Sequence, residues 1–150
     1  MRSSPVSGSA LSTAAWNLRK KLGESLSMMQ QYDVSIEQAT TLSLDALKAY
    51  AMANEERSKG NARASLGFYK RAVELDPNFA MAWARVGVHY ANQQEMEAAK
   101  EYVQKAYDLR DRVSERERLY ILEKYYTYIS GDTDKTIETL QTWAKLYPND

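Results

Sequence analysis

The sequence predicts an all-α fold, a solenoid of about three helical hairpins preceded by an amphipathic helix. The first observation is a 34-residue unit beginning at Ala80, in which apolar or small residues occupy positions 4, 7, 8, 11, 20 and 27. These residues are Trp83, Val86, Gly87, Tyr90, Ala99 and Ala106. The second is the spacing between residues that form turns and residues that end helices: Pro77 follows Gly60 by 17 residues, and Pro148 follows Gly131 by the same distance. Each hairpin is too small to bury its own apolar face, so we expect neighbouring hairpins to share a core.

The segment before the repeats divides into a leader, a helix and a connector. Residues 1–10 contain Ser, Gly and Pro and are expected to be a flexible leader, or the end left where the chain was cut from a longer protein. Residues 11–45 are expected to hold an amphipathic helix followed by a connector, because apolar residues recur at steps of three or four up to Gln31. The stripe consists of Leu11, Ala15, Leu18, Leu22, Leu26 and Met29. Ser43 is a candidate N-cap for the next helix.

Three repeats are expected to follow, over residues 46–79, 80–113 and 117–150. Gly60 and Asn61 mark the turn inside the first, and Gln93 and Gln94 mark the turn inside the second. Residues 114–116 are three extra residues before the third repeat, whose start at Glu117 is inferred by counting back from the glycine-to-proline spacing. With the leading helix, the expected total is seven helices.

Small residues at fixed positions predict where helices approach one another closely. Positions 8, 20 and 27 hold Ala53, Ser65 and Ala72 in the first repeat and Gly87, Ala99 and Ala106 in the second. Larger rings fill the volume beside these contacts: Trp83, Tyr69 and Tyr102. The third repeat departs from this pattern at the same positions, with Lys124, Thr136 and Trp143. Such departures are typical of a terminal repeat.

On these residues the chain resembles the tetratricopeptide repeat family, over residues 46–150. The resemblance implies a binding scaffold for other proteins that performs no chemistry. Three further stretches, residues 17–27, 36–41 and 109–117, look like the repeat-bearing C-terminal regions of some bacterial serine/threonine kinases and transcriptional regulators. No kinase or DNA-binding part is included in this sequence.

The resemblance also implies that positions 2, 5, 9, 12 and 13 of each first helix line a concave groove. The resulting candidates for partner binding are Tyr50, Asn54, Arg57, Met81, Val88, Asn92, Ile121, Tyr125 and Tyr128. Family members that bind chaperone tails use a clamp of lysine, arginine and asparagine. Tyr50, Arg85 and Leu122 stand at three of the clamp positions here, and only Asn54 and Arg118 match, so this ligand class is rejected.

Tyrosines gather in the first helix of the third repeat. Tyr120, Tyr125, Tyr126 and Tyr128 lie within nine residues, too many for one buried stripe. We expect Tyr120 to be core and Tyr125 and Tyr128 to face the groove, because tyrosine is enriched at interfaces. The alternative is that these rings fill the core or lie on the surface without a role.

Composition and motifs argue against catalysis. The chain has one histidine, His89, and no cysteine, and no phosphate-binding, nucleophile-elbow or HExxH pattern occurs. We therefore expect no cofactor and no metal. Twenty basic and twenty acidic residues cancel, which argues against nucleic acid, and no apolar run is long enough for a membrane helix. A cytoplasmic location fits the absence of cysteine.

Three functional hypotheses remain open. The first is a scaffold that binds a peptide or helix of another protein in the apolar and aromatic groove. The second is self-association, as a homodimer through the N-terminal helix or the face of the C-terminal repeat. The third is a helical bundle that binds a small molecule, or an enzyme, using tyrosine and arginine groups.

Overall fold

The computed structural model describes residues 41–149. The predicted leader over residues 1–10 and the predicted helix within residues 11–40 lie outside the described residues.

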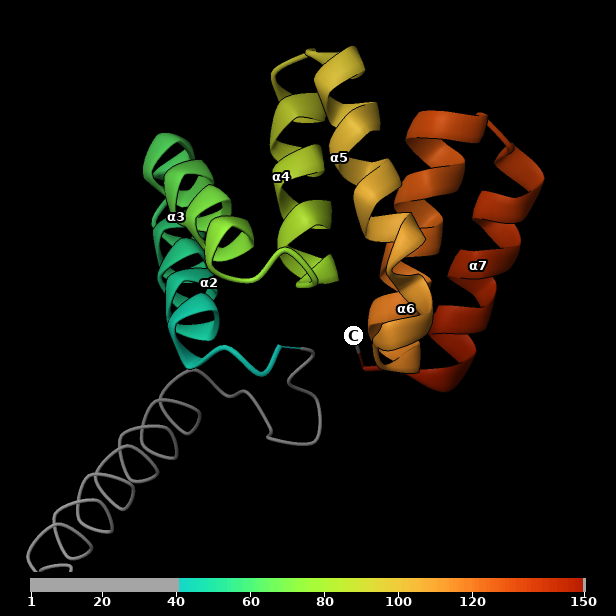
Figure 1. The fold of residues 1–150 in the computed structure, drawn as a ribbon. Coiled ribbons are helices and arrows are strands. Elements are labelled where there is room, and N and C mark those ends of the chain that lie inside the picture. Colours follow the sequence, from blue (N-terminus) through green and yellow to red (C-terminus); the bar gives the residue numbers. More distant parts are fainter. Residues whose placement is uncertain (1–40, 150) are drawn as a thin grey trace, which may run out of the picture. The chain divides into compact units, whose positions relative to one another are not determined.

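Helices arranged as antiparallel hairpins make up the described chain, which confirms the predicted all-α solenoid of helical hairpins (Figure 1). The first hairpin pairs α2 (Leu44–Ser58) with α3 (Ala62–Leu75), and the second pairs α4 (Ala80–Asn92) with α5 (Met96–Asp108). A short 3₁₀-helix, η2 (Arg110–Arg112), leads to the third hairpin. That hairpin consists of α6 (Glu115–Tyr125), a π-helical turn, η3 (Tyr126–Ser130), and α7 (Thr133–Leu146).

Polar side chains define where several of these helices begin. The hydroxyl of Ser43 accepts a hydrogen bond from the backbone N–H of Ala46 at 3.2 Å, so the N-cap predicted at Ser43 is confirmed. Ser114 and Glu117 form a reciprocal capping box at the start of α6. Asp132 accepts from the N–H of Lys135 and caps α7. These contacts satisfy amide groups that the helices themselves leave without partners.

All three hairpin turns pass through the left-handed region, at Gly60 (φ 78°), Gln94 (φ 64°) and Gly131 (φ 65°). In the first turn the N–H of Asn61 donates to the carbonyl of Glu56, five residues back. In the third turn the N–H of Asp132 donates to the carbonyl of Tyr126, six residues back. The third turn therefore contains one more residue than the first, and the π-helical turn η3 accommodates it.

Small residues form the contacts between helices, as predicted. Ala53, Ser65, Ala72, Ala99 and Ala106 are fully buried. A Cβ atom built on Gly87 would lie 2.6 Å from Cγ2 of Val103, so only glycine allows α4 and α5 to approach this closely. Among the larger rings, Tyr69 is fully buried, whereas Trp83 and Tyr102 are half-buried and stack with 5.7 Å between ring centroids.

Because of the extra residue in the third turn, the repeat positions of α6 differ by one residue from those predicted. Gly60 and Gly131 are 71 residues apart, whereas Tyr50 and Tyr120, whose hydroxyl groups both accept a hydrogen bond from Arg85, are 70 apart. Tyr120 therefore takes the place in α6 that Tyr50 has in α2. The predicted repeat positions in α6 were counted back from Gly131 as if the helix were α-helical throughout. Because η3 contains one extra residue, each of these predicted positions is one residue too far along the chain.

The outer face of α7 is apolar and uncovered within the described residues. Ile137, Leu140 and Leu146 are exposed by 48%, 48% and 52%. Tyr69 in α3 and Val103 in α5 occupy the repeat position of Leu140, and both are fully buried. The difference arises because α4 packs on α3 and α6 packs on α5, whereas no described helix follows α7.

Candidate functional site

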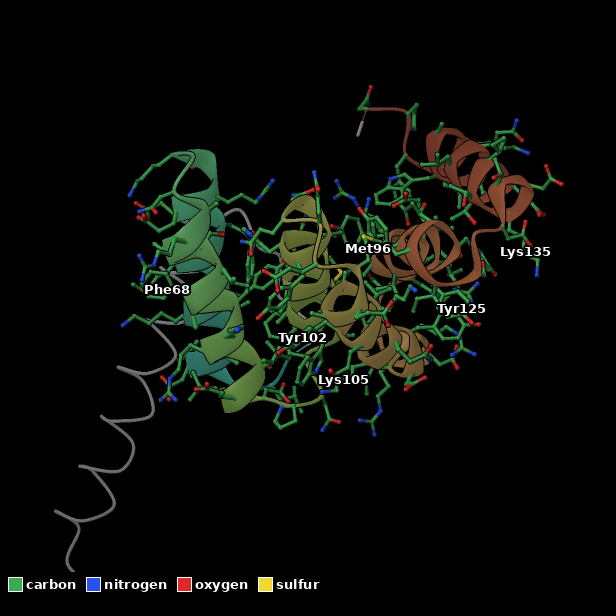
Figure 2. The ribbon with its side chains drawn as sticks, turned by 90° about the horizontal axis from the view of Figure 1, so that it is seen from above. Phe68, Met96, Tyr102, Lys105, Tyr125 and Lys135 are labelled. Carbon is green, nitrogen blue, oxygen red and sulfur yellow. The ribbon has the colours of Figure 1, made fainter. Side chains whose placement is uncertain are left out.

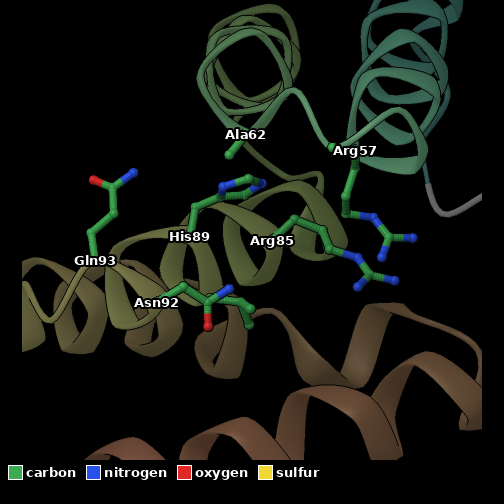
Figure 3. Close-up of a pocket in the computed structure, with 8 residues that line it drawn as sticks. Arg57, Ala62, Arg85, His89, Asn92 and Gln93 are labelled. Atoms are coloured by element: carbon green, nitrogen blue, oxygen red, sulfur yellow. The ribbon is translucent and has the colours of Figure 1, made fainter.

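A pocket of about 400 Å³ lies between the turn of the first hairpin and α4 (Figure 3). The turn contributes Gly60 and the beginning of α3, and α2 contributes Arg57 from its last turn. The remaining residues project from successive turns of one face of α4. The complete lining is Arg57, Gly60, Ala62, Arg85, Val88, His89, Asn92 and Gln93.

Arg85 connects the first helices of all three hairpins. Its Nε donates to the hydroxyl of Tyr50 on α2 at 3.4 Å, and its Nη1 donates to the hydroxyl of Tyr120 on α6 at 3.0 Å. The guanidinium carbon lies 4.6 Å from the centroid of the Tyr120 ring, which adds a cation–π contact. We call the row formed by α2, α4 and α6 the inner face. Arg85 thus fixes side chains from each of its three helices in one polar cluster.

His89 lies beside this cluster with its ring against α3. Its Nε2 is 3.3 Å from the hydroxyl of Ser65, and its ring centroid is 5.6 Å from that of Tyr69. The Ser65 hydroxyl donates to the carbonyl of Ala53 at 2.9 Å and is fully buried, so it is not presented as a nucleophile. Burial lowers the pKa of His89, and the positive charges of Arg57 and Arg85 lower it further.

The lowered pKa of His89 predicts a loss of stability in mild acid. The ordinary pKa is 6.5, so below this pH the unfolded chain binds a proton that the folded chain resists. The free energy of unfolding therefore falls as the pH drops below 6.5. The contribution of His89 to this fall ends once the pH is below the pKa of His89 in the folded state. We expect a lower melting temperature at pH 5.5 than at pH 7.5, and a smaller difference in His89→Gln. An equal difference in both proteins would contradict this assignment.

The predicted site residues separate into two groups in the structure. Arg57, Val88 and Asn92 line the pocket, and Tyr50 borders it through Arg85. Asn54 accepts a hydrogen bond from the Tyr69 hydroxyl and so supports the first hairpin. The structure thus brings these residues of α2 and α4 to one region of the inner face.

The other predicted site residues do not reach the pocket. Ile121 is fully buried and Met81 is 7% exposed, both in the core, so neither offers a binding surface. Tyr125 turns toward α5, where it stacks on Tyr107 with 3.7 Å between centroids. Figure 2 shows Tyr125 apart from Tyr102 and Lys105 of α5. Tyr128 is half-buried within η3. The one-residue register change in α6 explains why Ile121 is core, because it places Ile121 at the repeat position of buried Ala51.

Sequence reasoning missed Arg85, His89 and Tyr120 as members of the site. Tyr120 is predicted to be core and does pack against the core cluster, while its hydroxyl also accepts a hydrogen bond from Arg85. Arg85 is the only basic residue between Ala80 and Val88, and a single cation in an apolar helix was a signal that could have identified it.

In residues 41–149, no cluster of three or more His, Cys, Asp or Glu side chains has an arrangement that could hold a metal ion. Within the same range, every helix is too short or too polar to cross a membrane.

Comparison with known proteins identifies the second hairpin. The tetratricopeptide repeat family model matches residues 81–112, which lie within the predicted second repeat of residues 80–113 and span α4 and α5. A search of curated proteins found no match to the chain. The described chain is therefore an all-α, tetratricopeptide-like solenoid of helical hairpins, and its second hairpin matches the tetratricopeptide repeat family.

Proposed function

We propose that this protein is a non-catalytic scaffold that binds a peptide or a helix of another protein on its inner face. The observation that carries the proposal is the pocket beside Arg85, where half-buried Val88 lies among side chains that donate and accept hydrogen bonds. Apolar surface with a few fixed polar groups is the usual character of a recognition site. A cytoplasmic location, and a relationship to the C-terminal regions of bacterial kinases and regulators, stay predictions.

The rigidity of the inner face supports this function. Arg85 ties α4 to Tyr50 and Tyr120, so the pocket wall is already ordered before a partner arrives. Tyr50 is itself held by the rings of Tyr69 and Phe79, at centroid distances of 5.3 and 4.9 Å. A preorganised surface loses little conformational entropy on binding.

Filling the pocket tests the proposal. Peptides would first be selected from a random 12-residue library on the full chain, and the affinity of the best peptide measured by calorimetry. Asn92→Trp adds an indole to the pocket at an exposed position, so we expect a loss of about tenfold or more in affinity with an unchanged melting temperature. The matched control is Glu101→Trp, at an exposed position of α5. Equal affinities of the two variants for the peptide would contradict binding in the pocket.

Self-association is a second candidate, favoured by the outer face of α7. Ile137 and Leu140 are each 48% exposed where the preceding hairpins bury the corresponding surface. If a second copy covers this face, Leu140→Asp should convert a dimer to a monomer in light scattering, while Glu138→Asp, at an exposed neighbouring position, should not. A wild-type chain that is monomeric at high concentration would exclude this candidate.

A further inference from the structure

The pocket brings together two arginines whose charge no carboxylate neutralises. Arg57 and Arg85 both line it, and no ion pair among residues 41–149 includes either side chain. Several other cations of the described chain do have acidic partners one helical turn away, as in the pair of Lys59 with Glu55 at 2.7 Å. Two like charges that face one cavity repel each other, and an anion bound between them would remove that repulsion.

Arg85 is held in place by groups that leave its charge intact. Its two hydrogen-bond partners, Tyr50 and Tyr120, are phenols, and burial raises the pKa of Tyr120, so that hydroxyl is neutral at physiological pH. A guanidinium group has five N–H donors, and these two bonds leave others free. Figure 3 shows the Arg57 side chain coming from α2 and the Arg85 side chain from α4, with the two guanidinium groups close to each other.

The rest of the lining suits an anion carried on an apolar stem. Val88 and Ala62 supply aliphatic surface, and the amide of Asn92 supplies a further donor. A small hydrated ion would leave the aliphatic surface unused. A glutamate or aspartate side chain matches both parts, since its methylene groups contact the apolar wall and its planar carboxylate fits the guanidinium fork.

The lowered pKa of His89 agrees with this arrangement of the two arginines. After burial, the causes that lower it are Arg57 and Arg85, and no carboxylate acts in the opposite direction. The field at this point is therefore positive, which favours an anionic ligand.

We propose that this pocket is the subsite for an acidic side chain, glutamate or aspartate, of the peptide that the inner face binds. This inference rests on the proposed function. Arg57 and Arg85 bind the carboxylate, and Val88 contacts its aliphatic stem. The acidic side chain acts as the anchor that sets the register of the peptide on α2 and α4.

A double-mutant cycle tests the anchor. The best library-selected peptide and its glutamate-to-glutamine (or aspartate-to-asparagine) counterpart would be titrated into the full wild-type chain and into Arg57→Gln. Arg57 is exposed and makes no ion pair with another described residue, but its side chain interacts with the Tyr69 hydroxyl, so the melting temperature of Arg57→Gln would be measured alongside its affinities. We expect the amide peptide to bind the wild type about tenfold more weakly than the acidic peptide, and the two peptides to bind Arg57→Gln within about threefold of each other. Arg112→Gln, at an exposed site in η2, is the control of equal charge and should behave as the wild type.

The outcomes separate the anchor from the scaffold function. Selected peptides that lack an acidic residue, or an acidic peptide whose preference survives in Arg57→Gln, would overturn the anchor while leaving peptide binding in place. A library that yields no binding peptide would contradict the scaffold function and the anchor together. Loss of preference in Arg57→Gln but not in Arg112→Gln supports both.

Discussion

Replacing Tyr69 with alanine is expected to lower the free energy of unfolding by about 3–5 kcal/mol, the largest loss we anticipate from one substitution in this chain. Tyr69 is the largest of the fully buried side chains, and its ring contacts those of Tyr50 and His89. Its removal would leave a cavity between α3 and the inner face. It would also take away the hydroxyl that donates to Asn54. Urea denaturation followed by circular dichroism would measure the loss.

Tyr69→Phe separates the ring from the hydroxyl. It keeps the packing and deletes the hydrogen bond to Asn54, so the expected loss is about 1 kcal/mol. Burial raises the pKa of Tyr69 to about 12, which shows how strongly this position disfavours a charge. Equal losses for Tyr69→Ala and Tyr69→Phe would contradict the view that the ring fills a packed core.

The same glycine-to-alanine change is expected to have opposite signs at two helical positions. In α4, a Cβ at position 87 would lie 2.6 Å from Val103 Cγ2, 3.1 Å from the Val103 backbone nitrogen and 3.2 Å from the Ala99 carbonyl oxygen. The valine methyl can rotate, but the backbone atoms cannot move without separating α4 from α5. We therefore expect Gly87→Ala to destabilise the fold by about 1–3 kcal/mol.

Gly67→Ala provides the matched control in α3. No atom lies within 4 Å of a Cβ built at Gly67, which is exposed in the interior of the helix. Alanine should stabilise the helix there by about 0.5–1 kcal/mol, because glycine loses more backbone entropy on folding. Melting temperatures that move in the same direction for Gly67→Ala and Gly87→Ala would contradict the close approach of α4 and α5.

The repeat pattern predicted the second hairpin best because its small residues are determined by close helix packing. Gly87, Ala99 and Ala106 lie where larger side chains would separate the helices, so the positions that the pattern singles out are the positions the fold requires. The glycine-to-proline spacing likewise located the turn at Gly131 and the end of α7, since both depend on local backbone chemistry.

The third repeat shows what such spacing leaves undetermined. Gly131 fixes the turn, but the hydrogen-bonding pattern of the preceding helix decides which residues face inward. The six-residue span from Tyr126 to Asp132 changes that pattern by one residue. As a result Ile121 is core, and the Tyr120 ring packs against the core while its hydroxyl reaches Arg85. Arg85 was missed for another reason: its role depends on tyrosines 35 residues away on either side, which no local pattern relates.

The central claim is that the inner face beside Arg85 is where this protein binds its partner, and chemical-shift mapping tests it most directly. The full, isotope-labelled chain would be titrated with the library-selected peptide while backbone amide and arginine Nε–H signals are recorded by NMR. We predict saturable shifts concentrated at Arg57, Arg85, Val88 and Asn92, with little change along α7. Shifts confined to the outer face of α7, around Ile137 and Leu140, would contradict the claim.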